Sequence, residues 1–222
     1  MRIEFVGDSL TSAEGVLAPR GNDEWIPLFF SAAAGYAHIC ARELGAEYRI
    51  LSQSGYGVNW DWQFIAENNM ADGYRKIVGT QKGEAAEARG CQNDYDFSAW
   101  KADIVVIRLH SNDVGGMRGK DNVAEMRDKA VEGSVRFLKD VRACNPDAKI
   151  VWIAPDSRTM PELSEETVER CKRDGMENVS LFKLPDYTEE DLAARGHPGA
   201  EYNRRAGLIL AEYLKGLTGE QF

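Results

Sequence analysis

Residues 2–11 read RIEFVGDSLT, and this stretch decides which fold class the chain belongs to. Its first part is a short apolar-rich run of the kind that forms a buried β-strand, and Gly7 ends the run. Similar strand candidates lie at residues 50–52, 103–109, 150–155 and 179–184. Two stretches among them, DIVVIRL and KIVWIAP, are almost continuously apolar. Strands of that composition are covered on both faces, as in a parallel sheet that lies between layers of helices.

Helical patterns separate the strand candidates. Apolar residues repeat at three-to-four spacing over residues 126–141 and again over residues 202–214. The alternation of strand and helix predicts an α/β fold with three layers, α/β/α, and a length of 222 residues suits one large domain. Residues 67–100 interrupt the alternation because they are rich in Asn, Gly, Gln and charge, so we expect an insertion or a long loop there.

Composition excludes several classes of protein. With 43% hydrophobic residues, 28% charged residues and only 7 prolines, the chain has the composition of a folded protein and not of a disordered one. The formal net charge of −9 repels phosphate backbones and anionic lipid headgroups, so we expect neither a nucleic-acid partner nor a membrane partner. The cysteines occur singly, without the spacing that binds zinc, at Cys40, Cys91, Cys144 and Cys171. We therefore predict reduced thiols and no metal site.

The N-terminal segment carries no pattern of an export signal. Glu4 interrupts the apolar run that a signal peptide needs. The longest apolar stretch, residues 26–41, contains His38 and is too short to span a bilayer. The sequence as it reads predicts a cytoplasmic location, and it leaves the oligomeric state open.

Four short segments carry the residues that are typical of a catalytic site. Ser9 follows the first predicted strand, and ligands of parallel α/β sheets bind just beyond the carboxyl ends of the strands. The alternative interpretation is that Gly-Asp-Ser forms a tight turn with a capping hydroxyl. Three further segments favour the catalytic interpretation, and they lie at residues 52–58, 108–113 and 196–199.

Together these segments hold what ester cleavage requires. A serine hydroxyl is a poor nucleophile unless an imidazole accepts its proton, and the oxyanion of the tetrahedral intermediate needs fixed hydrogen-bond donors. Ser9 and His197 are the predicted nucleophile and base. The predicted oxyanion hole consists of the Ser9 N–H, the Gly55 N–H and the Asn112 side chain.

The order of these segments resembles that of the SGNH (GDSL-like) hydrolases: GDSL, then a glycine, then a Ser-Asn-Asp run, then a C-terminal His-Pro. Within that superfamily the chain is similar to the family 2 carbohydrate esterases, which deacetylate sugars. The resemblance implies a flavodoxin-like SGNH domain over residues 1–222 and no metal or cofactor. It assigns the signature roles to Ser9, Gly55, Asn112 and His197, with Gly57 as a competing choice for the glycine.

Two positions depart from the family pattern. His110 stands where the third segment has a glycine, and Ala194 stands where an acid three residues before the histidine is usual. The resemblance implies that a backbone carbonyl orients the imidazole of His197, because some family 2 esterases use such a dyad. We expect that carbonyl within residues 190–196, and Asp191 is the alternative acid.

Further side chains are candidates for substrate contact. Tryptophans usually pack in the core, but Trp60 or Trp62 would suit the C–H face of a sugar. The other candidates are Asp8, Gly57, His110 and Asp191. The predicted function is serine-dependent removal of a short acyl group, acetyl above others, from a small or oligomeric carbohydrate ester. The alternatives are a sugar O-acyltransferase and a sugar-binding module that has lost turnover.

Overall fold

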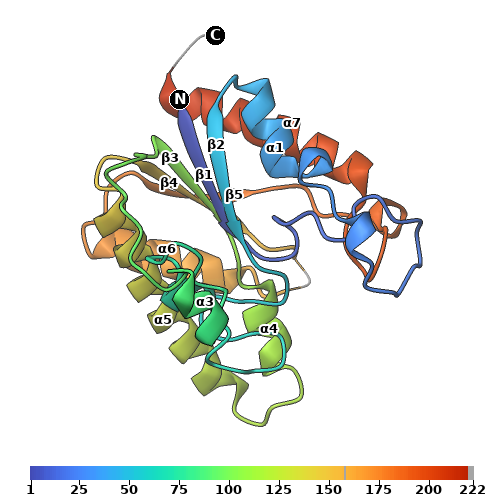
Figure 1. Ribbon diagram of the computed structural model, residues 1–222, viewed down its shortest axis with the longest axis horizontal. Helices are drawn as coiled ribbons and strands as arrows, with labels where there is room; N and C mark the ends of the chain where they lie inside the picture. The colour runs from blue at the N-terminus through green and yellow to red at the C-terminus, as the bar shows by residue number, and fades with distance from the viewer. Residues whose placement is uncertain (158, 220–222) are drawn as a thin grey trace.

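Five parallel strands form the centre of the computed structural model, which describes residues 1–157 and 159–219 (Figure 1). The strands are β1 (Arg2–Gly7), β2 (Glu47–Ser52), β3 (Ile104–Arg108), β4 (Lys149–Ala154) and β5 (Val179–Lys183). Their spatial order is β2-β1-β3-β4-β5, which is the flavodoxin-like order. Phe5 of β1 is in register with Ile50 of β2 on one side and with Val106 of β3 on the other. The predicted parallel α/β sheet is confirmed.

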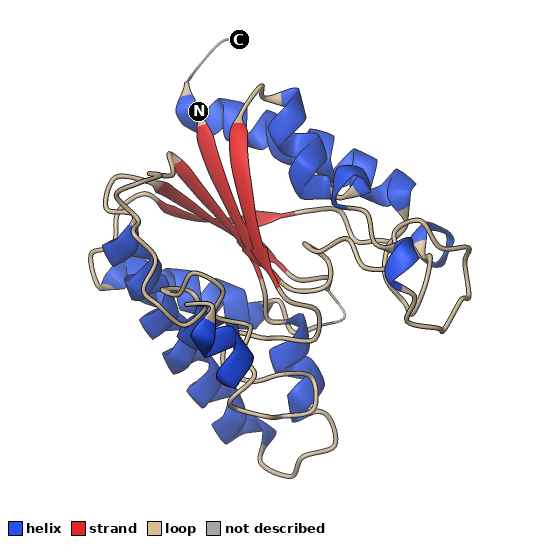
Figure 2. Ribbon diagram, viewed as in Figure 1, coloured by secondary structure: helices blue, strands red, loops and turns tan. Residues whose placement is uncertain are grey.

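Helices cover both faces of the sheet (Figure 2). One face carries α1 (Tyr36–Glu43) and α7 (Ala200–Thr218), and the other carries α5 (Val123–Cys144) and α6 (Glu162–Arg173). Along β3, Ile104 and Val106 face the α1/α7 side, whereas Val105 and Ile107 face the α5/α6 side, and all four are fully buried. Because alternate residues of a strand point to opposite faces, burial on both faces explains the continuous apolar runs.

The segment between β2 and β3 departs from regular alternation, as expected. It contains two short helices, α2 (Met70–Gly73) and α3 (Glu84–Ala88), joined by turns. Tyr74 and Phe97 from this segment pack against the α5 side of the core, so the insertion is anchored by aromatic rings. The remaining elements are α4 (Ser111–Met117) and the short 3₁₀ turns η1 (Pro27–Phe29), η2 (Ala32–Ala34) and η3 (Glu189–Asp191).

The order of the strands determines where the loops meet. From β1 the chain passes to β2 on one side and later to β3 on the other, so the loops after β1 and β3 diverge at the edge where their carboxyl ends lie. A crevice forms at such a switch point in doubly wound sheets. Among the helices in the described residues, none is long and apolar enough to cross a membrane.

Candidate active site

Ser9 lies on a tight turn directly after β1. The N–H groups of Thr11 and Ser12 both donate to the Asp8 carbonyl, at 3.1 and 2.9 Å. Gly7 precedes this turn, and a Cβ at Gly7 would lie 2.0 Å from the Thr11 hydroxyl oxygen, so the turn requires glycine there. The turn therefore places the serine hydroxyl beyond the carboxyl end of the sheet. The tight-turn and catalytic interpretations of Gly-Asp-Ser describe the same geometry.

His197 approaches Ser9 from the loop between η3 and α7. Its Nε2 lies 2.8 Å from Ser9 Oγ, although 188 positions separate the two residues in sequence. Two backbone hydrogen bonds hold this loop: the His197 N–H donates to Ala194 O, and the Ala193 N–H donates to His197 O, both at 2.8 Å. The imidazole Nδ1 lies 3.1 Å from the backbone carbonyl of Arg195, within the 190–196 stretch where an orienting carbonyl is expected.

The environment of His197 favours the neutral imidazole. Burial lowers the pKa of His197, because a cation loses hydration there, while the charge of Glu14 opposes this effect. With Nδ1–H donating to the Arg195 carbonyl, Nε2 carries the lone pair and faces the Ser9 hydroxyl. The pair has the arrangement in which an imidazole accepts a serine proton.

Asn112 and Gly55 lie beside Ser9 and His197 in one cavity of about 280 Å³. Asn112 is in the first turn of α4, and its Nδ2 donates to Tyr56 O at 3.0 Å and more weakly to Asp8 Oδ2 at 3.3 Å. Gly55 has φ +83°, a backbone conformation that favours glycine, and it lies on the loop after β2. The structure thus brings the predicted nucleophile, base and oxyanion-hole residues to one place.

Gly57 has a different role from Gly55. Its N–H donates to Trp60 O at 2.8 Å, and a Cβ there would lie 2.3 Å from Asp113 Oδ2. Gly57 is therefore required for close packing of two loops, and Gly55 is the glycine that lines the cavity.

Asp113 is a supporting residue that sequence reasoning did not single out. Its carboxylate accepts hydrogen bonds from the backbone N–H groups of Val58 and Asn59, at 2.8 and 2.9 Å. Its backbone carbonyl accepts one from Trp60 Nε1 at 2.9 Å. The loop after β2 is thereby bound to the first turn of α4, and the available signal was the Asn-Asp pair at residues 112–113.

The structure corrects the expectation that His110 contacts substrate. The ring is fully buried, lies between the hydroxyls of Ser134 and Ser164 at 2.8 Å each, and packs on Trp152. Burial lowers the pKa of His110 to about 4, so the ring is neutral at neutral pH. Its φ of +93° explains why a glycine suits this position.

Three other candidates are also corrected. Asp191 bonds to Thr188 and Arg205 through its two oxygens, so its carboxylate is not used to orient His197. Trp60 is only 7% exposed and packs in the core. Asp8 is buried beneath the turn, where desolvation raises its pKa to about 7, and it holds Leu10 N–H and Asn112 instead of lining the cavity.

The cavity wall contains side chains that sequence reasoning missed. Trp62 lines the cavity as considered, and Trp25 lines it too, with 57% of its surface exposed. Trp25 lies in an irregular segment without periodicity, so no sequence signal identified it. Glu14 and Arg195 complete this wall. Among the described residues, His, Cys, Asp and Glu side chains form no cluster of three or more that could hold a metal ion.

Comparison with known proteins relates this site to carbohydrate esterases. No family model matches the chain. Among curated proteins, it is 26% identical over 190 residues to the cellulase/esterase CelE of Acetivibrio thermocellus, covering 83% of this chain and 21% of that protein. The chain thus spans about a fifth of this curated relative.

Solved structures match over nearly the whole chain. An acetyl xylan esterase from the rumen bacterium Butyrivibrio proteoclasticus has a TM-score of 0.92 and 32% identity, covering 98% of this chain and 64% of that one. A family two carbohydrate esterase from Clostridium thermocellum, solved with cellohexaose, has a TM-score of 0.83 and 24% identity at the same coverage. A GDSL-like lipase from Bacteroides uniformis, with a TM-score of 0.57 and 17% identity, covers 97% of this chain and 95% of its own.

These matches confirm the family resemblance drawn from the sequence motifs. The flavodoxin-like strand order and the Ser9–His197 geometry occur in a chain whose structural neighbours are SGNH-type esterases and lipases. The chain has the fold of these SGNH-type neighbours, and over nearly its whole length it is similar to the acetyl xylan esterase and to the family two carbohydrate esterase.

Proposed function

We propose that this chain is a carboxylic ester hydrolase that removes acetyl groups from a carbohydrate through an acyl-serine intermediate. The observation that carries the proposal is the 2.8 Å contact between Ser9 Oγ and His197 Nε2 in a cavity that Gly55 and Asn112 also line. The acetyl xylan esterase named above supports the carbohydrate ester as substrate, because it is 32% identical to this chain.

The first half of the reaction forms the acyl-enzyme. Ser9 Oγ attacks the ester carbonyl carbon while His197 Nε2 accepts the hydroxyl proton. The Arg195 carbonyl, facing Nδ1 at 3.1 Å, keeps the imidazole in the required tautomer and stabilises it once it is protonated. Collapse of the tetrahedral intermediate breaks the ester bond, and the imidazolium returns its proton to the departing sugar oxygen.

The oxyanion hole stabilises the intermediate. The carbonyl oxygen gains negative charge as Oγ bonds to carbon, and fixed N–H donors lower the free energy of that charge. Ser9 and Gly55 supply backbone N–H groups, and Asn112 supplies its Nδ2. Asn112 Nδ2 carries two hydrogens. The one that points to Asp8 makes the longer contact, at 3.3 Å, so it is the one that can be donated to the oxyanion. Loss of one such donor costs about 3 kcal/mol of transition-state stabilisation.

Water then completes the cycle. His197, neutral again, accepts a proton from water as the water oxygen attacks the acyl-Ser9 carbon, and the second tetrahedral intermediate uses the same oxyanion hole. Its collapse releases the carboxylic acid and restores the Ser9 hydroxyl. A hydroxyl of a second sugar in place of water would make the chain an acyltransferase.

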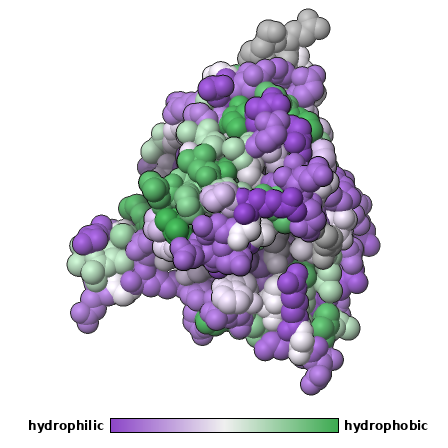
Figure 3. Space-filling model, turned by 90° about the vertical axis from the view of Figure 1, so that its right-hand side faces the viewer, coloured by the Kyte–Doolittle hydropathy of each residue, from purple (hydrophilic) through white to green (hydrophobic). Residues whose placement is uncertain are grey.

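The shape of the cavity favours a short acyl group on a sugar. Trp25 and Trp62, more than half exposed, offer indole faces on which the C–H face of a sugar stacks. A cavity of about 280 Å³ suits an acetylated sugar unit, and its other lining groups are mostly polar, as for Ser54 and Asn112. The side of the molecule seen in Figure 3 is largely hydrophilic, with apolar patches among the polar residues.

The test compares wild type with Ser9→Ala and His197→Ala. We expect wild type to hydrolyse p-nitrophenyl acetate faster than the octanoate and to release acetate from an acetylated oligosaccharide. Ser9→Ala removes the attacking hydroxyl, and activity above about one per cent of wild type would refute the assignment.

Two further measurements separate the alternatives. An organophosphonate should label one serine in wild type and none in Ser9→Ala. A binding module would bind the oligosaccharide without being labelled. Turnover that depended on an added sugar acceptor would identify an acyltransferase instead of a hydrolase.

A further inference from the structure

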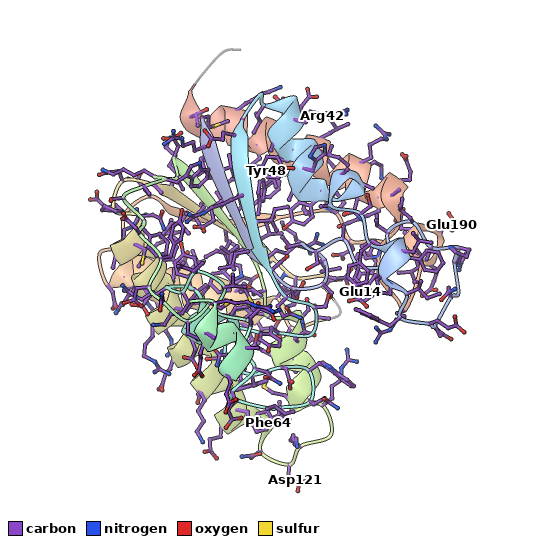
Figure 4. The ribbon with its side chains drawn as sticks, in the orientation of Figure 1. Glu14, Arg42, Tyr48, Phe64, Asp121 and Glu190 are labelled. Carbon is purple, nitrogen blue, oxygen red and sulfur yellow. The ribbon has the colours of Figure 1, made fainter. Side chains whose placement is uncertain are left out.

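Glu14 is a buried carboxylate in the wall of the cavity that the mechanism above does not use. Its side chain is only 5% exposed, and it lines the same cavity as Ser9 and His197. Figure 4 shows it beyond the strands, on the inner side of the loops that project there, whereas Glu190 lies at their outer side. The Glu14 N–H donates to Ser9 O at 3.0 Å, so its backbone is tied to the nucleophile's own turn.

The partner of Glu14 is the residue that orients the catalytic imidazole. Arg195 Nη1 lies 2.9 Å from Glu14 Oε1, and the backbone carbonyl of the same Arg195 faces His197 Nδ1 at 3.1 Å. A buried carboxylate is tolerated when it is paired, and this pair joins positions 181 apart in sequence. One arginine therefore connects Glu14 at its guanidinium end with His197 at its carbonyl end.

The backbone of Arg195 needs such an anchor. Arg195 has φ +52°, a left-handed conformation that a residue with a side chain adopts only when its surroundings impose it. Its N–H donates to Asn22 O at 2.8 Å, and its side chain is held by Glu14. The two loops also touch closely at Gly15, where a Cβ would lie 2.8 Å from the Ala194 Cβ. The loop after β1 therefore holds the histidine loop at Ala194 and at Arg195.

The charge of Glu14 acts on His197 as well. Burial has the largest effect and lowers the pKa of His197; of the charged groups nearby, Glu14 raises this pKa and Arg195 lowers it. The loops after β2 and β3 face the cavity with Ser54, Gly55, Trp62 and Asn112, which do not titrate in the working range. Glu14 is thus the negative charge that opposes the cost of forming the imidazolium.

We propose that Glu14 is a positioning residue that replaces the acid absent at Ala194: its ion pair with Arg195 fixes the carbonyl that orients His197, and its charge stabilises protonated His197. This inference rests on the proposed function. In a direct triad the carboxylate contacts Nδ1 itself. In this chain the carboxylate comes from the loop after β1 and acts through the main chain of a second residue.

The test uses Glu14→Gln, which keeps the shape and removes the charge. For acetyl-ester hydrolysis we expect kcat to fall by about 10- to 100-fold, less than the ~10⁴-fold loss caused by neutralising an acid in direct contact with the imidazole. KM should change by less than about threefold, since Glu14 stabilises the imidazolium that forms only during the reaction. The acidic limb of the kcat/KM profile should move to lower pH, because the pKa of His197 falls when the negative charge is removed.

Arg195→Gln supplies a second variant, and it tests the direction of the electrostatic effect. It should also lower kcat, but it should move the acidic limb to higher pH, because it removes the positive charge that lowers the pKa of His197. Opposite shifts distinguish an action on the imidazole from simple loosening of the fold. Since Arg195 is 40% exposed on its side chain, this variant serves if Glu14→Gln does not fold.

Glu189→Gln is the matched control. The Glu189–Arg20 ion pair joins the same two loops at 3.7 Å but on their exposed side, so its loss should leave kcat within about twofold and the pH profile unchanged. Organophosphonate labelling of Ser9 counts folded sites in every variant.

Two results would overturn the inference: a kcat for Glu14→Gln within about threefold of wild type, or acidic limbs that shift in the same direction in both variants. Failure of the proposed function is a separate result, because it would appear as activity that persists in Ser9→Ala.

Discussion

Replacing His110 with glycine should cost stability without removing activity. The ring is fully buried, with its centroid 4.7 Å from that of Trp152, and it hydrogen-bonds to two serine hydroxyls. Glycine relieves the positive φ by about 1 kcal/mol, but it also raises the entropy of the unfolded chain by a similar amount, so these effects cancel. The remaining effect is the cavity that the missing His110 ring leaves in the core, and losing a buried aromatic ring costs about 3–5 kcal/mol. We expect His110→Gly to lower the free energy of unfolding by about 4 kcal/mol.

The pH dependence of this loss gives an independent check. Because burial lowers the pKa of His110 from 6.5 to about 4, its native state stays neutral where the unfolded chain binds a proton. Wild type therefore loses stability as the pH falls from about 6.5 to about 4, by up to roughly 3 kcal/mol, and His110→Gly lacks this loss. The difference between the two proteins should shrink over that interval.

The assay is urea unfolding followed by tryptophan fluorescence, together with acetyl-ester kinetics at low temperature. His110→Asn is the control, because asparagine tolerates the left-handed backbone and retains hydrogen-bonding groups, so it should lose less stability than His110→Gly. In both variants kcat/KM per labelled Ser9 should stay within about threefold of wild type. Unchanged stability with a drop in kcat/KM of about tenfold or more would show that His110 acts on the reaction and that our reasoning from its burial fails.

Three further outcomes are expected. Asp191→Asn should lower kcat in the acetyl-ester assay by less than about tenfold, because that carboxylate is engaged by Arg205; a ~10⁴-fold loss would make Asp191 the orienting acid. In wild type, the acidic limb of kcat/KM against pH should be centred below the ordinary histidine pKa of about 6.5, because burial lowers the pKa of His197; a limb centred above that value would contradict this. Asp8→Asn should gain stability relative to wild type as pH rises from about 4 to about 7, because the pKa of Asp8 is raised to about 7 and wild type must ionise a buried carboxyl over that interval. In chemical unfolding the gain should reach up to roughly 4 kcal/mol, and a difference in unfolding free energy that stays constant with pH would contradict it.

The sequence by itself determined the sheet and the reacting pair. A strand that is buried on both faces can be recognised from its own sequence. Every residue of a strand such as Ile104–Arg108 must suit an apolar environment, apart from the polar residue at its end. The ends of such strands are then visible as the points where apolar runs meet Gly, Ser and Asn. Because parallel strands align their carboxyl ends, Ser9, Gly55 and Asn112 were expected at one edge before any contact was known.

Local sequence preference gives the wrong position for a residue whose place depends on a contact across a loop. Proline favours the first turn of a helix and Pro198 lies just before the last helix, but α7 begins at Ala200 and Pro198 instead forms an isolated bridge with Leu192. That bridge closes the loop that presents His197. The local preference of proline for a first helical turn was outweighed by a pairing that the loop requires.

Tertiary structure alone decided the surroundings of the reacting pair. Trp60 and Trp62 are only two positions apart on one loop, yet Trp60 is buried and Trp62 is exposed. The path of that loop decides which of the two side chains reaches the cavity. The pairing of Glu14 with Arg195 joins two irregular segments, in which side-chain direction follows no period. The periodicity of a strand or a helix indicates which of its faces is buried. Contacts between loops depend instead on how segments far apart in the sequence pack together, and no local sequence pattern indicates such a contact.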